Sequence, residues 1–114
     1  MRLRDKTALK KIVSEINIAL EFVGDISLED FLRNEMMKRA VGMTAINVGE
    51  LVKNLTSEFR IVNSQIPWKD VAGFRDIAAH KYETLDMQQV YNTVREDFPA
   101  LKLQIENILA ADES

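Results

Sequence analysis

Cysteine is absent from the 114 residues, and histidine occurs only once, at position 80. The missing thiols exclude disulfides and thiolate metal sites. One histidine also argues against a zinc site built from a single chain, because such sites draw on several His or Cys ligands. A metal site is therefore improbable, and we expect neither a metal nor a cofactor.

Glycine, proline and long apolar runs are scarce as well. Four Gly and two Pro are few for a chain with many tight turns, so long uninterrupted helices are expected. No run approaches the roughly 20 apolar residues that span a bilayer, and the first residues lack the apolar core of a signal peptide. We expect one cytoplasmic domain over residues 1–114, with no membrane contact.

Charge is distributed unevenly along the chain. The net charge of −3 argues against a passive nucleic-acid coat, which is normally basic. Residues 1–11 nevertheless carry five bases against one acid, Asp5, whereas acids outnumber bases after position 83. Such segregation often reflects solvated helix faces, so by itself it is weak evidence for binding a polyanion.

Apolar residues recur every three or four positions from residue 9 to residue 23, which predicts a helix capped by Asp5 or Thr7 and closed at Gly24. Ser27 and Asp30 form a capping-box variant. The apolar pattern after them predicts one helix to about Leu55, roughly 42 Å long.

Three small residues share one face of that long helix: Gly42, Ala45 and Gly49. Glycine costs a helix about 1 kcal/mol relative to alanine, so two glycines need a reason. Close approach of another helix is the simplest one, and a slight kink is the alternative.

The second half of the chain is predicted to hold three further helices. Residues 56–65 lose the periodicity and indicate a connection with one short turn. Pro67 suits the first position of a helix that runs to about Tyr82. Asp86 with Gln89 starts another helix, which Pro99 must end or sharply kink near Phe98, and the last helix follows. With no strand pattern, the fold class is all-α: an antiparallel bundle of four to five helices.

Side chains suited to catalysis lie close together in the sequence between residues 75 and 82. Asp76 and His80 are i, i+4 neighbours on the third long helix, while Arg75 and Tyr82 share the adjacent face. The pattern suits metal-free RNA cleavage: His80 moves protons near neutral pH, Arg75 binds phosphate oxygens, and Asp76 orients the imidazole. Because acid–base catalysis uses two groups and each chain has one His, a homodimer is expected to complete the site.

Each of these residues also has an ordinary structural interpretation. A lone His near the end of a helix usually packs or interacts with the helix dipole. Arg75 then pairs on a solvated face, and Tyr82 is a helix-end aromatic with its hydroxyl in water. Spacing alone does not decide between the two interpretations.

The segment Arg75-x-x-x-x-His80-x-Tyr82 resembles the R-x-x-x-x-H-x-Y motif of HepT-like HEPN proteins. Further segments resemble the family across the chain: Ile46–Leu55 (its I-G-E-A segment), Ile66-Pro67-Trp68, Tyr82–Asp86 (its Y-x-x-V-D) and Asp97–Leu101 (its D-L-P-x-L). Asp76 stands where the family often has Asn or another polar residue, and Ala78-Ala79 where it often has bulkier aliphatics.

The resemblance implies a dimeric helical bundle with metal-independent endoribonuclease activity, catalytic Arg75 and His80, and a toxin role. It also implies an antitoxin partner, a minimal nucleotidyltransferase (MNT) that transfers AMP to Tyr82 and blocks the RNA cleft. Glu50 would orient Arg75, or be an ordinary exposed helix residue. Two alternatives remain: a non-catalytic HEPN partner that presents a modification site to a nucleotidyltransferase, and a helical adaptor with neither chemistry.

Overall fold

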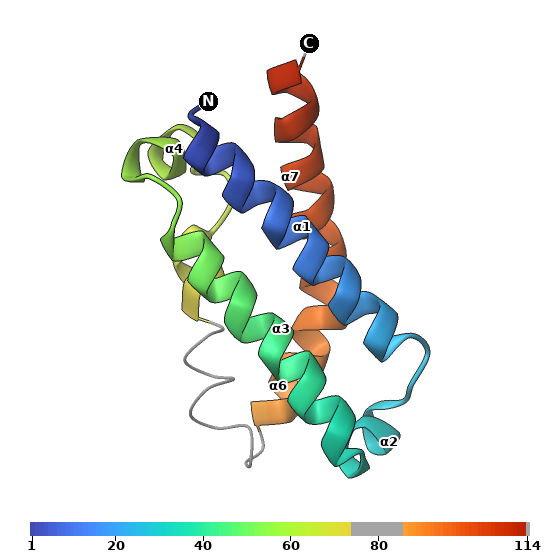
Figure 1. Cartoon of the computed structure of the whole chain (residues 1–114). Coiled ribbons are helices and arrows are strands. Elements are labelled where there is room, and N and C mark those ends of the chain that lie inside the picture. Colours follow the sequence, from blue (N-terminus) through green and yellow to red (C-terminus); the bar gives the residue numbers. More distant parts are fainter. Residues whose placement is uncertain (74–85, 114) are drawn as a thin grey trace.

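A computed structural model describes residues 1–73 and 86–113 of the chain (Figure 1). This part is built from helices, and no strand occurs in it. The predicted all-α class is thereby confirmed. None of the helices in these two ranges is both long enough and apolar enough to cross a bilayer.

Two long antiparallel helices, α1 (Leu3–Val23) and α3 (Glu35–Lys53), form the centre of the bundle. The last helix, α7 (Phe98–Glu113), packs against α1 with its C-terminal end near the N-terminus of the chain (Figure 1). The predicted antiparallel arrangement is therefore found among the described helices.

One apolar cluster joins these helices. It takes i, i+3 and i+4 positions from each of them, as the periodicity predicted. Its fully buried members with large side chains include Leu9, Ile12, Ile16, Phe31, Val41, Val48, Leu55, Ile66, Met87, Phe98 and Ile105.

The prediction of one uninterrupted helix from Ser27 to Leu55 is wrong, because Asn34 interrupts the helix. The Ser27 hydroxyl accepts from the Asp30 amide at 3.1 Å, as predicted, and starts α2 (Leu28–Arg33). Asn34 is extended (φ −100°, ψ 96°), and its side chain accepts from the Met37 amide at 3.0 Å, which starts α3. An asparagine that can cap a new helix competes with continuing the old one.

The predicted cap of α1 is also wrong, because neither Asp5 nor Thr7 caps it. The N-cap position is Arg2, which makes no side-chain capping bond. Asp5 is buried and serves a distant element: its two carboxylate oxygens accept from the Thr56 amide and the Thr56 hydroxyl, each at 2.8 Å. Thr56 in turn caps α4 (Ser57–Val62), the short turn predicted in this connection, by accepting from the Phe59 amide at 3.1 Å.

Of the two predicted effects of Pro99, an end or a sharp kink of the helix near Phe98, the end is wrong. Helix α6 (Asp86–Asn92) continues through a π-helical turn, η1 (Thr93–Asp97), into α7, where Pro99 is the second residue. The Phe98 amide donates to the Thr93 carbonyl, five residues back. Because proline lacks an N–H and clashes with the carbonyl four residues earlier, a wider turn at this point lets the helix continue.

Among residues 1–73 and 86–113, no second backbone lies close to Gly42. It is buried, and a Cβ atom placed on it would lie 4.0 Å from Cε of Met87, which is an ordinary contact. Gly42 therefore faces α6 of its own chain.

The Asp5–Thr56 pair supplies the first prediction. Asp5→Ala leaves two donors of Thr56 without their buried acceptor, so the free energy of unfolding should fall by about 2–3 kcal/mol. Urea denaturation followed by circular dichroism measures the change. Thr7→Ala, at the exposed alternative cap, should change the value by no more than about 0.5 kcal/mol. Equal effects of the two variants would contradict the assignment of Asp5.

Candidate functional site

The motif residues Arg75, Asp76, His80 and Tyr82 lie outside the described residues, as do Phe74, Ile77 and Ala78 of the predicted stripe. Their predicted roles therefore remain predictions. The structure describes the chain on both sides of this segment, up to Gly73 and from Asp86 onward. These flanks show how the segment is attached to the bundle.

The helix that leads into the motif begins at Trp68, one residue after Pro67. The Val71 amide donates to the Pro67 carbonyl at 3.1 Å, so Pro67 occupies the last position before the helix rather than its first turn. Val71 is buried, as its place in the predicted stripe requires. The start of this helix is thus confirmed to within one residue.

Trp68 fixes that start against α4. Its indole is buried, and Nε1 donates to the Asn63 carbonyl at 3.0 Å. The ring also packs against Phe59, with 5.8 Å between the ring centroids. Because Phe59 belongs to α4, which the Asp5–Thr56 pair holds, the helix entering the motif is tied to α1 through two successive contacts.

The residues that follow the motif, from Asp86 onward, are also attached to the bundle. Met87 and Val90 of α6 are buried in the core. The Tyr91 hydroxyl donates to the Ile26 carbonyl at 2.7 Å, and its ring packs against Phe31 with centroids 5.2 Å apart. Arg95 lies over the Tyr91 ring, 5.6 Å from its centroid. Both flanks of the motif are therefore anchored in one bundle.

A cation that sequence reasoning did not single out lies on α4. Arg60 is half-buried, and its Nε atom is buried without a hydrogen-bond partner among the described residues. Such a group is normally satisfied by an acceptor, and a guanidinium favours carboxylate or phosphate oxygens. Only the folded structure could reveal it, since exposure and partners are not visible in sequence.

Glu50 lies on the exposed side of α3. It lines a groove of about 310 Å³ together with Lys11 and Glu15 of α1. Its predicted action on Arg75 remains a prediction. No group of three His, Cys, Asp or Glu side chains placed to hold a metal ion occurs in ranges 1–73 and 86–113.

A family model described as "Ribonuclease HepT-like" matches residues 12–108, which include the motif and both of its flanks. Because this match covers most of the chain, the protein belongs to the HepT-like ribonuclease family. The predicted resemblance is confirmed.

Relatives match over nearly their whole length. The chain is 35% identical to "Putative RNase TTE0752" of Caldanaerobacter subterraneus subsp. tengcongensis, with 92% of this chain and 94% of the relative covered. It is 33% identical to "Probable ribonuclease HepT" of Thermococcus cleftensis, covering 95% and 98% respectively. It is 34% identical to "Putative RNase MJ1380" of Methanocaldococcus jannaschii, covering 89% and 93%. No solved structure matched.

The Trp68 anchor supplies the second prediction. Trp68→Phe keeps a buried ring but removes the donor to Asn63, so the free energy of unfolding should fall by about 1 kcal/mol, more if the smaller ring leaves a cavity. Amide hydrogen exchange should accelerate at residues 63–73. Tyr91→Phe is the matched control, since it removes one donor from the Ile26 carbonyl and should accelerate exchange around residues 24–28 instead. Identical exchange patterns would contradict a local anchor at Trp68.

Proposed function

We propose that this protein is a metal-independent endoribonuclease that acts as the toxin of a type II-like toxin–antitoxin pair. The observation that carries the proposal is the Arg75-x-x-x-x-His80-x-Tyr82 motif in a chain that belongs to the HepT-like ribonuclease family. The names of relatives that match over nearly their whole length support RNA as the substrate.

In the proposed reaction, one His80 imidazole removes the proton from a ribose 2′-hydroxyl. The resulting oxygen attacks the adjacent phosphorus, and the bond from phosphorus to the 5′-oxygen breaks. The departing oxygen takes a proton from a second, protonated imidazole. The products are a 2′,3′-cyclic phosphate and a 5′-hydroxyl, so atoms and protons balance without water or metal. Arg75 stabilises the charge that develops on the phosphate oxygens, and Asp76 orients the imidazole.

A homodimer supplies the second imidazole, because each chain contains one histidine. A two-fold axis close to the motif would place two Arg75–His80 pairs in one cleft. The firm anchoring of both flanks supports this arrangement, since a composite site needs each half held in place by its own bundle.

The off-switch we propose is AMP transfer to Tyr82 by an MNT-type nucleotidyltransferase antitoxin. An adenylate on this residue adds a negative phosphate on the helix face that it is predicted to share with Arg75. The added phosphate would compete with RNA for the same cation.

Catalysis supplies the third prediction. His80→Ala should lower the RNA cleavage rate about 10²–10⁴-fold, because it removes both proton-transfer groups of the dimer. The rate is measured with a labelled RNA in the presence of EDTA. Lys102→Gln, a single-charge change on α7, should cleave at the unmodified rate. Undiminished cleavage by His80→Ala would overturn the catalytic assignment, and absent cleavage by the unmodified protein would favour the non-catalytic partner instead.

Modification supplies the fourth prediction. Incubation with the cognate nucleotidyltransferase and ATP should add mass in multiples of one AMP, seen by intact-protein mass spectrometry. Tyr82→Phe should abolish the added mass. The chain has only two tyrosines, so Tyr91→Phe is the natural control and should still be modified. Equal modification of the Tyr82→Phe variant would remove Tyr82 from the mechanism.

A further inference from the structure

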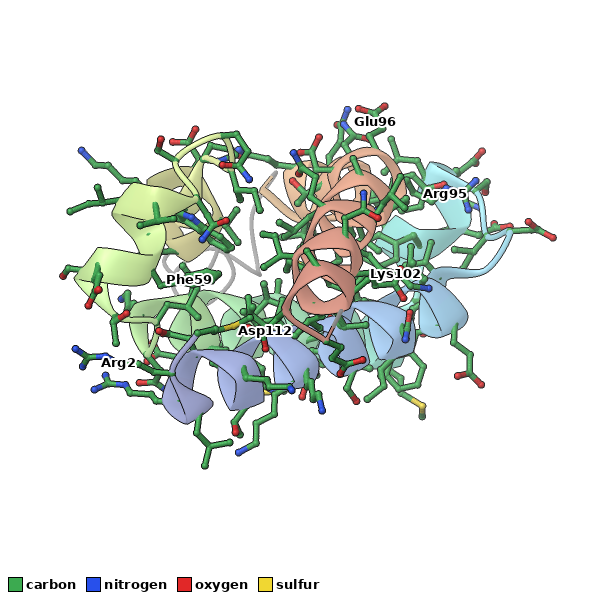
Figure 2. All side chains as sticks on the ribbon, turned by 90° about the horizontal axis from the view of Figure 1, so that it is seen from above. Arg2, Phe59, Arg95, Glu96, Lys102 and Asp112 are labelled. Carbon is green, nitrogen blue, oxygen red and sulfur yellow. The ribbon has the colours of Figure 1, made fainter. Side chains whose placement is uncertain are left out.

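The cluster of five N-terminal cations divides into two sets in the folded protein. In the first set, a guanidinium nitrogen of Arg2 lies 3.3 Å from a carboxylate oxygen of Glu58, and Nζ of Lys6 lies 3.7 Å from a carboxylate oxygen of Asp112. Figure 2 looks down on this end of the bundle, with Arg2 at the start of α1 and Asp112 near the end of α7. The one acid in the stretch, Asp5, is buried on Thr56.

The second set consists of Arg4, Lys10 and Lys11. Within the described ranges no carboxylate lies within ion-pairing distance of these three side chains. All three are exposed on α1. Internal pairing thus leaves the positive charge of the N-terminal region concentrated on a short stretch of one helix.

Arg4 makes a hydrogen bond to the end of α3. Its Nε donates to the carbonyl of Asn54, the C-cap residue of α3, at 2.7 Å. This bond occupies one donor of the guanidinium, and its two amino groups remain for a ligand. A planar, permanently charged fork of this kind suits phosphate oxygens.

Arg4 and Lys11 line the same groove, of about 550 Å³, between α1 and the C-terminal end of α3. Thr7 lies between them, and Leu51 and Asn54 form the α3 side. Positions 4, 7 and 11 share one helix face, and the Cα atoms of residues 4 and 11 are about 10 Å apart along the helix axis. No carboxylate belongs to the residues that line this groove.

The groove continues into the smaller one lined by Glu15 and Glu50, which shares Lys11 with it. Asn47 donates to Glu15 at 3.2 Å, so this end carries an ordered carboxylate. A polyanion would be attracted to the Arg4–Lys11 part and repelled from the Glu15 part. The groove therefore has a cationic section with a defined end.

We infer that the Arg4–Lys11 groove binds the phosphodiester backbone of RNA, outside the Arg75–His80 motif. The choice of RNA rests on the proposed function, in which RNA is the substrate. The two cations contact phosphates, and the Thr7 hydroxyl and Asn54 amide are placed to contact phosphate or ribose oxygens. No aromatic side chain lines the groove, so it lacks a stacking platform for bases. Binding there is accordingly independent of sequence.

The test measures binding apart from cleavage. A fluorescent single-stranded RNA with 2′-O-methyl riboses cannot form the attacking 2′-oxygen, so anisotropy in EDTA reports binding alone. Arg4→Gln and Lys11→Gln should each weaken binding about three- to tenfold near 0.1 M salt. Each should also lower the slope of log affinity against log salt by about 0.7, the value for one phosphate contact on a single strand.

Lys10→Gln is the matched control, because it removes the same charge from the neighbouring residue, which does not line the groove. It should change affinity less than twofold. Equal losses for Lys10→Gln and Lys11→Gln would show diffuse attraction and overturn the groove. Unchanged affinity in Arg4→Gln and Lys11→Gln, with tight binding by the unmodified protein, would overturn the groove while leaving the proposed ribonuclease intact. No binding by the unmodified protein would overturn both.

Discussion

The two hydrogen bonds between the buried Asp5 carboxylate and Thr56 are the contact on which the attachment of residues 68–73 depends. They fix the start of α4 to the first turns of α1. Phe59 and the Asn63 carbonyl of that segment then hold Trp68. A carboxylate near the N-terminus is therefore linked, through a short series of packed groups, to the helix that enters the motif. Loss of this acceptor would weaken the contacts that hold residues 68–73, which precede the motif in the sequence.

The regular part of the fold was predictable because it is local. The apolar spacing of α1 and α7 identifies their buried faces without knowledge of any neighbour. The errors fall at residues whose structural effect depends on what surrounds them in the fold. Asn34 caps a new helix although the surrounding pattern continues, and Pro99 is tolerated because a π-helical turn precedes it. Asp5 looks like a helix cap, yet its acceptors serve Thr56, which lies 51 residues away in the sequence.

The candidate site also combines local features, which the sequence reveals, with contacts between distant residues, which it does not. The chemistry of Arg75, His80 and Tyr82 is a property of residue type and spacing, so sequence alone suggested it. Their supports were predictable only in part: Pro67 marked the start of the helix, but nothing in the sequence pairs Trp68 with Asn63. The Arg4–Lys11 groove was beyond sequence reasoning, since it exists only where the end of α3 meets α1.

A chain of net charge −3 that acts on a polyanion must confine its positive potential to chosen places. Here the confinement comes from pairing. Glu58 and Asp112 pair with Arg2 and Lys6 at one end of the bundle, which weakens the attraction of those two cations for a phosphate. Arg4 and Lys11 have no such ion pair among the described residues, and the carboxylate of Glu15 lies beyond the cationic section of the groove. The electrostatic attraction between these two cations and RNA phosphates falls steeply with salt concentration and with distance. RNA that docks on α1 would therefore lie along the groove rather than bind over the whole surface.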